Sequence, residues 1–336
     1  MSVENLILQA KGSKLNLDVY FPKTTFGSIF AEDGSPGFVT LRNSNIRFET
    51  ISYFLKKPLE LAGTVNASGN IRGNLKKLES SNLRLAYQDS TRLNAVVSLE
   101  NIIESDLLDM DIRVQSSKVS LGEIDSLLTN VEFPQGLYDM GTLGLNANFL
   151  GKYYDFSVGA NIFSPKGNLA GTVSMFFPQN DSANTYTGNF STTNFDLNTL
   201  LGVEGNISNR LNARFAVNGQ GYNIDELAGT YEMWAGNSNI LGSVIDSSHI
   251  FLTALDKELN SNIDVWDRQG IAHSTFNWNL KESIPHFKLK GQLQNMDLKQ
   301  FGVSEKPIWI DTEYDIDTQG ESPAEWIGKF DFSQFS

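Results

Sequence analysis

The sequence of 336 residues contains no cysteine, which excludes disulfide bonds, zinc–thiolate sites and cysteine nucleophiles. Basic residues are also scarce, since 26 Lys and Arg stand against 39 Asp and Glu, and the formal net charge is −13. Phosphate contacts need clustered cations, so no nucleic-acid partner is expected. The sequence has no run of about 18 apolar residues, so no segment is expected to cross a membrane as a helix.

The first residues, MSVENLILQAKGSKLNLDVYF, lack the features of a signal peptide. They have no basic start, no continuous apolar core and no small-residue cleavage site. We therefore expect either a cytosolic protein or a targeting segment that lies outside this chain.

Alternation of apolar and polar residues is the dominant pattern in the sequence. Residues 61–75 place Val65 and Ala67 on one face of a strand and Asn66 and Ser68 on the other. The same two-residue period recurs in KLNLDVYF, RLNAVVSLE, TLGLNANF, RLNARFAVN and STFNWNL. Helical periodicity never lasts longer than about two turns, so the pattern predicts an all-β, antiparallel fold.

A short phrase interrupts the strands at four places. It begins with an apolar residue, which is Ile46, Val119, Phe195 or Met296. Two residues later comes Phe48, Leu121, Leu197 or Leu298, and three residues after that Ile51, Ile124, Leu200 or Phe301. The first step has the period of a strand and the second that of a helix, so each phrase predicts a strand end followed by a short helical turn.

A glycine followed by a turn and a returning strand forms a second recurring pattern. The glycines are Gly73, Gly151, Gly221 and Gly320. The phrases recur at intervals of 73, 76 and 101 residues and the glycines at intervals of 78, 70 and 99 residues. The phrases and the glycines keep the same order, and the longest interval falls at the same place for both. The pattern therefore predicts stacked repeats, the longest of which contains one inserted hairpin.

The predicted repeats together form one continuous elongated domain. Their ranges are a partial N-terminal repeat at 1–45, repeat 1 at 46–118, repeat 2 at 119–194, repeat 3 with its insertion at 195–295 and a truncated repeat 4 at 296–336. Because the last repeat is cut short, we expect this chain to be a piece of a longer protein.

Residues that commonly carry catalysis or bind metals do not cluster in the sequence. His249, His273 and His286 are separated by hairpins and read as surface or turn residues. Asp109 and Asp111 lie two apart on a predicted strand, which favours a solvated polar face over a paired-carboxylate site. We expect no catalytic residues, no metal and no cofactor, and therefore a protein that is not an enzyme.

Two features of the sequence resemble the TamB/AsmA-like superfamily. One is the strand-to-turn motif, at Phe195-Asp196-Leu197 and Met296-Asp297-Leu298. The other is the glycine-spaced strand from Gly69 to Leu75. The TamB-like proteins of Bacteroidota-type bacteria are the most similar members. The sequence lacks the N-terminal anchor and the conserved C-terminal domain of that family.

The resemblance implies a taco-like β-groove in the periplasm that conducts phospholipid between the inner and outer membranes. It also implies a role in outer-membrane assembly with a BamA/TamA-type barrel protein, and an inner-membrane anchor missing from this chain. Phospholipid acyl chains would lie on the apolar faces of the strands. The candidate groove residues are Leu145, Phe149, Phe156, Val158, Leu211, Phe215, Val217, Phe276, Trp278, Phe287 and Leu289.

Periodicity does not distinguish an open apolar groove from a closed core. The alternative is therefore a surface, adhesion or glycan-binding protein built of β-sandwich repeats. The sequence has only 9 prolines and no linker between the repeats, which favours a continuous sheet. An outer-membrane barrel ranks third, because the helical turns interrupt the strands.

Overall fold

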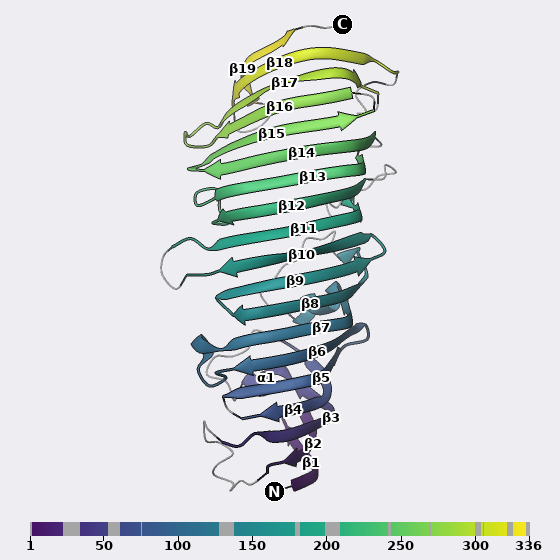
Figure 1. The fold of residues 1–336 in the computed structure, drawn as a ribbon, viewed down its shortest axis with the longest axis vertical. Helices are drawn as coiled ribbons and strands as arrows, with labels where there is room; N and C mark the ends of the chain where they lie inside the picture. Colours follow the sequence, from purple (N-terminus) through teal and green to yellow (C-terminus); the bar gives the residue numbers. More distant parts are fainter. Residues whose placement is uncertain are drawn as a thin grey trace. The chain divides into compact units, whose positions relative to one another are not determined.

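The computed structural model confirms the predicted all-β, antiparallel fold with short helical turns. It describes residues 2–22, 34–52, 61–74, 76–127, 138–178, 182–198, 209–240, 243–268, 270–299, 304, 306–320 and 325–333. The chain divides into two compact units, Met1–Pro165 and Lys166–Ser336. Within each unit the strands follow one another in sequence order (Figure 1).

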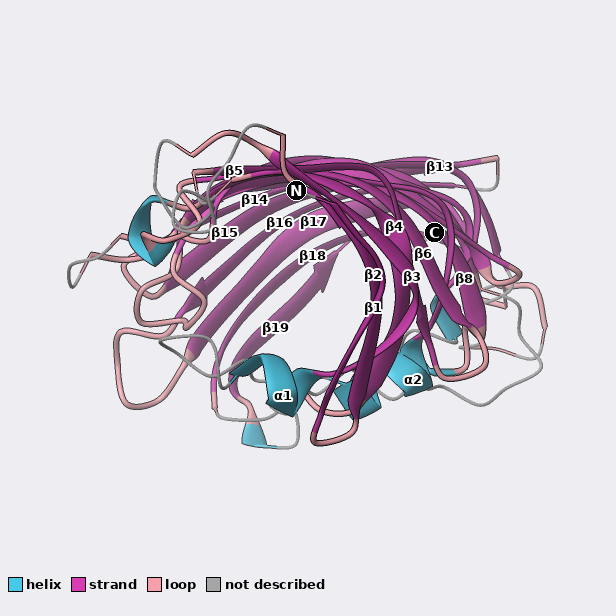
Figure 2. Cartoon of the chain, turned by 90° about the horizontal axis from the view of Figure 1, so that it is seen from below, coloured by secondary structure: helices cyan, strands magenta, loops and turns pink. Residues whose placement is uncertain are grey.

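The first unit is an open sheet of nine described strands, each hydrogen-bonded to its neighbours in the sequence. The strands are β1 (Ser2–Ala10), β2 (Ser13–Tyr20), β3 (Gly37–Arg47), β4 (Thr64–Gly73), β5 (Lys77–Tyr87), β6 (Thr91–Glu100), β7 (Asp109–Ser120), β8 (Thr142–Lys152) and β9 (Asp155–Ser164). Two short helices, α1 (Phe48–Ser52) and α2 (Leu121–Leu127), follow β3 and β7. Figure 2 shows these strands as strongly curved, with the helices at their ends.

The second unit is an open sheet of ten described strands with the same sequential pairing. The strands are β10 (Gly167–Phe176), β11 (Thr185–Asp196), β12 (Arg210–Gln220), β13 (Ala228–Ile240), β14 (Ser243–Leu255), β15 (Glu258–Asp267), β16 (Gly270–Asn279), β17 (His286–Asp297), β18 (Trp309–Gln319) and β19 (Ile327–Ser333). Greek-key connections do not occur among the described strands of either unit, which disfavours the β-sandwich alternative.

The four marker glycines occupy matching places at the ends of even-numbered strands. All four have φ between 70° and 153°, a region that disfavours side chains. A Cβ atom at each glycine would lie 2.0 to 2.9 Å from the carbonyl oxygen of a residue that begins the return, which is Lys77, Asp155, Glu226 or Glu325. Each repeat thus needs a glycine where the chain folds back on its own backbone.

The helical phrases follow β3, β7, β11 and β17. Successive phrases are therefore four, four and six strands apart. The additional length of the third predicted repeat corresponds to one more hairpin.

Curvature of the strands coincides with β-bulges, each an extra residue in an odd-numbered strand. Five of these residues lie two to four positions before their strand ends: Asn43, Ser116, Asn194, Asn237 and Asn295. Their φ values run from 35° to 51°, in the left-handed region that asparagine tolerates better than most residues. Bulges bend and twist a strand, so a line of them curves the sheet along one edge.

Neighbouring side chains satisfy the backbone groups that the bulges free. Ser44, Ser117 and Ser238, which follow three of the bulged residues, are only 0 %, 3 % and 1 % exposed. Their hydroxyl oxygens accept the backbone N–H groups of Asn16, Asn94 and Asn212 at 2.9, 2.9 and 3.0 Å.

Side chains on the following strand complete other bulges. Ser116 donates its backbone N–H to Asn146 at 2.8 Å, Asn194 to Asn212 at 2.7 Å, and Asn295 to Asp311 at 2.6 Å. Asparagine, aspartate and serine at these places are therefore structural, because they pair backbone donors that the sheet ladder leaves unpaired at a bulge.

Replacement of Ser238 by alanine tests the importance of a completed bulge. We expect Ser238→Ala to lower the free energy of unfolding by about 1–3 kcal/mol, because the Asn212 amide loses its acceptor. Hydrogen exchange of that amide should accelerate. The control is Ser247→Ala on the exposed surface of β14, which should change the free energy by less than about 0.5 kcal/mol. Equal exchange rates at Asn212 in wild type and Ser238→Ala would contradict the bulge account.

Candidate functional site

One face of the second unit is apolar, as the cross-strand register shows. Directly opposed residues share a face of a sheet, so each register row crosses the strands on one side. One row contains Val173, Gly188, Val217, Tyr231, Leu252, Ser261, Phe276, Leu289, Ile316 and Phe330. The adjacent row on the same side contains Gly171, Phe190, Phe215, Met233, Ile250, Ile263, Ser274, Gly291, Tyr314 and Phe332.

The seven candidate groove residues of the second unit all lie on this side of its sheet. They are Leu211, Phe215, Val217, Phe276, Trp278, Phe287 and Leu289. We call this side the apolar face of the second unit, and the opposite side its polar face.

The first unit has an apolar face of the same kind. One row contains Val3, Val19, Val39, Ile71, Ser80, Val97, Ile112, Phe149 and Val158. Leu145 and Phe156 lie on this side as well, because they alternate with Phe149 and Val158 along β8 and β9. The candidates thus share one face within each unit.

Most of the candidate side chains are half-buried rather than enclosed. Leu211 is buried at 8 % exposure and Trp278 is exposed at 38 %, while the others lie between these classes. Aromatic neighbours shield one another sideways, with ring centroids 4.9 Å apart for Phe149 and Phe156 and 4.7 Å apart for Phe190 and Phe215. Side chains of this size are usually fully buried in a sealed core, so partial exposure favours an open apolar face.

The polar face of the second unit carries ion pairs and amides. Lys288 Nζ lies 3.2 Å from a carboxylate oxygen of Asp317, and Lys290 Nζ lies 2.7 Å from one of Asp315. These pairs are partly exposed and add little stability. The ion pairs and amides keep this side of the sheet hydrated, while the opposite side is apolar.

The helical phrases lie at equivalent positions at the strand ends. Phe48, Leu197 and Leu298 donate their backbone N–H groups to Gly63, Asn209 and Ile308 at 3.1, 3.0 and 2.9 Å, and each acceptor immediately precedes the next strand. Leu121 begins α2 at the corresponding point of its phrase. Leu200 and Phe301 lie outside the described residues, as does the side chain of Ile51.

The aspartates of two phrases bond to the backbone of the turn that follows. Asp196 accepts the backbone N–H of Asn198 at 3.1 Å, and Asp297 accepts that of Lys299 at 3.0 Å. A bond from an aspartate to the backbone two residues on is typical of an Asx-turn, which gives the recurring Asp-Leu pair a structural role.

The turn after β11 covers one end of the apolar face. Leu197 packs against a buried cluster formed by Leu211, Ala213 and Ala235. Phe195, two residues before Leu197, is itself buried near the end of β11. The phrase therefore closes the end of the face and leaves its middle open.

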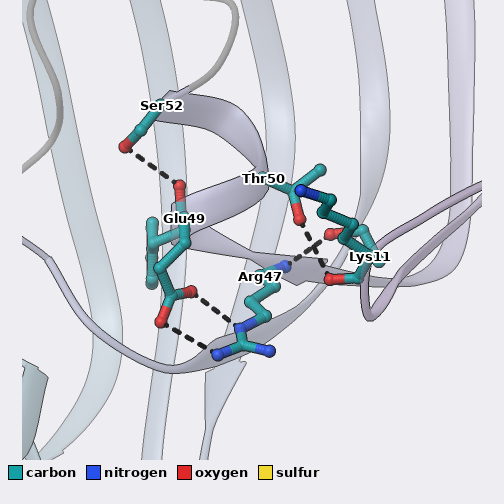
Figure 3. Close-up of polar contacts among 7 residues, drawn as sticks. Lys11, Arg47, Glu49, Thr50 and Ser52 are labelled. Atoms are coloured by element: carbon teal, nitrogen blue, oxygen red, sulfur yellow. Dashed lines mark hydrogen bonds and ion pairs between the residues drawn. The ribbon is translucent and has the colours of Figure 1, made fainter.

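Helix α1 is fastened to the turn between β1 and β2, as Figure 3 shows. Thr50 donates its hydroxyl to the carbonyl oxygen of Lys11 at 3.4 Å, and Arg47 donates its backbone N–H to the hydroxyl of Ser13 at 2.8 Å. A salt bridge of 3.0 Å joins the side chains of Arg47 and Glu49.

Helix α2 is fastened in the equivalent way to the turn between β5 and β6. Ser120 donates its backbone N–H to the hydroxyl of Thr91 at 3.1 Å. The Glu123 carboxylate accepts the backbone N–H groups of Asp89, Ser90 and Thr91 at 3.2, 2.8 and 2.7 Å. Burial raises the pKa of Glu123, but these hydrogen bonds outweigh burial and hold its pKa below the ordinary value.

A pair of tyrosines places hydroxyl groups on the apolar face of the second unit. The hydroxyl oxygens of Tyr186 and Tyr231 are 2.7 Å apart, and Tyr186 also reaches the carbonyl oxygen of Gly221 at 3.2 Å. Burial, followed by the bond to Tyr186, raises the pKa of Tyr231. The Tyr231 phenol therefore stays neutral, and the two hydroxyls are bonded to each other rather than left unpaired.

Sequence reasoning missed several polar contacts of structural importance. The side-chain amide of Asn212, on the polar face of β12, accepts the backbone N–H of Asn194 at 2.7 Å and donates to the carbonyl oxygen of Asn237 at 2.8 Å. The five left-handed residues before the strand ends carried a usable signal, because asparagine or serine recurs there. A bulge shifts the apparent alternation by one residue, which hides it in a pattern of period two.

Known proteins provide no direct comparison, since no family model, curated protein or solved structure matches this chain. None of the helices in the described part of the chain has the length and hydropathy needed to cross a bilayer. Likewise, no group of three or more His, Cys, Asp or Glu residues within the described ranges is arranged to hold a metal ion.

The pH dependence of the α2 attachment follows from the lowered pKa of Glu123. A carboxyl group whose pKa is lower in the folded state contributes its full stability above the ordinary pKa, and that contribution is lost as the pH falls through the folded pKa. We expect hydrogen-exchange protection of the Asp89, Ser90 and Thr91 amides to weaken on acidification below pH 4.5, the ordinary value for glutamate. The variant Glu123→Gln should show weaker protection of these three amides at neutral pH as well. The control Glu104→Gln, at an exposed position, should retain the wild-type pH profile. If protection of the three amides in the wild-type protein did not change with pH, the proposed role of Glu123 in attaching α2 would be wrong.

Proposed function

We propose that this chain is part of a non-enzymatic periplasmic scaffold whose apolar faces carry phospholipid acyl chains between the inner and outer membranes. The proposal includes a role in outer-membrane assembly with a BamA/TamA-type barrel protein, and an inner-membrane anchor outside this chain. The observation that carries it is the open, half-buried apolar face present in each unit. The resemblance to TamB-like proteins in the strand-to-turn motif points the same way.

The energetics of an acyl chain on such a face are favourable. Each methylene removed from water contributes about 0.8 kcal/mol. The half-exposed rings of Phe215, Phe276 and Phe287 offer apolar area without the need to open a core. A charged headgroup can remain in water, because the face is not enclosed.

Few groups on the apolar face would bind a lipid headgroup strongly. The tyrosine hydroxyls are bonded to one another, and the lysines of β17 pair with aspartates on the opposite side. A surface that offers mainly apolar contact suits movement along it better than tight, specific binding.

Site-specific photo-crosslinking tests which face meets lipid. A benzophenone amino acid placed at Phe215 or Val217 should crosslink to radiolabelled phospholipid in cells, because both positions lie on the apolar face. The same group at Ala216 or Asn218, on the polar face of the same strand, should not. Equal crosslinking from both sides of β12, or none from the apolar side, would refute the lipid path.

A charge on the apolar face should block lipid without unfolding the protein. We expect Phe215→Asp to retain a cooperative unfolding transition, since water can reach a half-buried position, but to lose lipid crosslinking at Val217. The matched control is Asn218→Asp on the polar face, which should crosslink normally. If the face were instead part of a sealed core, Phe215→Asp would lower the free energy of unfolding by about 3–5 kcal/mol, because the charge would be buried without a partner. The cooperative unfolding transition would then be lost.

A further inference from the structure

All three histidines of the sequence lie on the polar face of the second unit, each beside a carboxylate. His249 Nε2 is 2.7 Å from a carboxylate oxygen of Glu232, and His273 Nδ1 is 2.6 Å from one of Asp264. His286 contacts Asp317 in the same way. All three are partly exposed at the surface, as expected from the sequence, and each pairs with a carboxylate on a neighbouring strand.

Two of these histidines belong to one row of the polar face. Its stretch from β13 to β18 contains Trp234, His249, Asp264, His273, Gln292 and Glu313, and Arg214 on β12 directly opposes Trp234. Each member directly opposes the next across a strand pair. Most other polar-face rows of this unit carry Thr, Asn, Lys and Asp, so the row differs from its surroundings in chemistry.

Two tryptophans are exposed on this polar face: Trp234 belongs to the row, and Trp266 lies in the row beside it, opposite Ser247. Trp234 stacks on His249 with ring centroids 5.4 Å apart and planes 12° apart, and it remains 42 % exposed. Trp266 meets His273 edge-on at 5.9 Å and remains 38 % exposed. Large exposed aromatic side chains grouped with polar neighbours mark a binding surface more often than chance.

An open depression of about 1010 Å³ continues the row toward β18. Its lining includes Asp264, His273, Gln292 and Glu313, together with Asn262. Planar carboxylate and amide groups therefore line a hollow whose size is that of a small-molecule site. The bond from His273 fixes the Asp264 carboxylate in one orientation, which reduces the entropy lost when a ligand binds.

We propose that this row is a saccharide-binding site on the polar face of the second unit. Trp234 and Trp266 would contact the C–H groups of pyranose rings. Asp264, Gln292 and Glu313 would accept or donate hydrogen bonds to the ring hydroxyls. The site is independent of the apolar face, so it stands whether or not that face carries lipid.

The charges of the row select among saccharides. The lining of the depression carries four carboxylates, those of Asp264, Glu313, Asp315 and Asp331, against the single lysine Lys290, which pairs with Asp315. A uronic or phosphorylated sugar would meet like charges there, whereas neutral hydroxyls and acetamido groups would find acceptors. The ligand is therefore a neutral oligosaccharide.

Isothermal titration of the intact chain with three tetrasaccharides tests the proposal. Cellotetraose and chitotetraose are the neutral probes, and tetragalacturonate is the acidic one. We expect at least one neutral probe to bind and the acidic probe not to bind. Trp234→Ala and Trp266→Ala should each weaken neutral binding about tenfold or more, because a truncated tryptophan anchor costs that much in other interfaces.

The control is Trp309→Ala, since this tryptophan is also exposed, at 45 %, but begins β18 opposite Asp297, four residues before Glu313. It should bind as wild type does. Asp264→Asn should weaken binding while its unfolding temperature stays near that of wild type, which separates lost recognition from lost folding.

Absence of heat with both neutral probes at millimolar concentration would overturn the proposal, and would be the outcome if the row docks a protein instead. Preference for tetragalacturonate, or equal losses in Trp309→Ala and Trp234→Ala, would overturn it as well.

Discussion

The hydrogen bonds that complete each β-bulge are the constraint on which the rest of the structure depends. A bulge adds one residue to one strand only, and thereby frees backbone groups that the ladder no longer pairs. Ser44, Ser117 and Ser238 meet that need with one buried hydroxyl each. Without these acceptors the bend would cost more than flat pairing, and the strands would lose the curvature seen in both units.

The bulges also position the side chains of the strand ends. Beyond a bulge the alternation shifts by one residue, so Phe195 and Met296 return to the apolar side just before the chain turns. The helical phrase that follows can then fold over the end of the face. Curvature, closure of the ends and the strand-to-turn motif are consequences of the same extra residue.

Much of the fold was predictable because its signals are local. Strict alternation specified strands, the sparse helical period limited helices to about two turns, and Gly73 and Gly151 marked places where the chain must fold back. The shared face of Phe215, Phe276 and Leu289 was predictable for the same reason, since alternation alone assigns side chains to faces.

The pairs that join residues distant in sequence were not predictable. Glu123 binds a turn more than thirty residues away, and nothing near either segment announces the contact. The row from Trp234 to Glu313 depends on the register of five strand pairs, each of which must be known to place the next. The bonds of Asn212 to Asn194 and Asn237 were not predictable either, because these partners become its neighbours only once two bulges have formed.

Sequential pairing has a mechanical consequence for each unit. Because each inner strand is held by the strands immediately before and after it in sequence, tension along the chain at the end of a unit would load its outermost strand pair first. Hydrogen bonds in such a pair would open one after another, as in a zipper, rather than resist together as in shear. Under tension each unit should therefore unfold one strand at a time. When the load is removed, the strands should pair again one at a time.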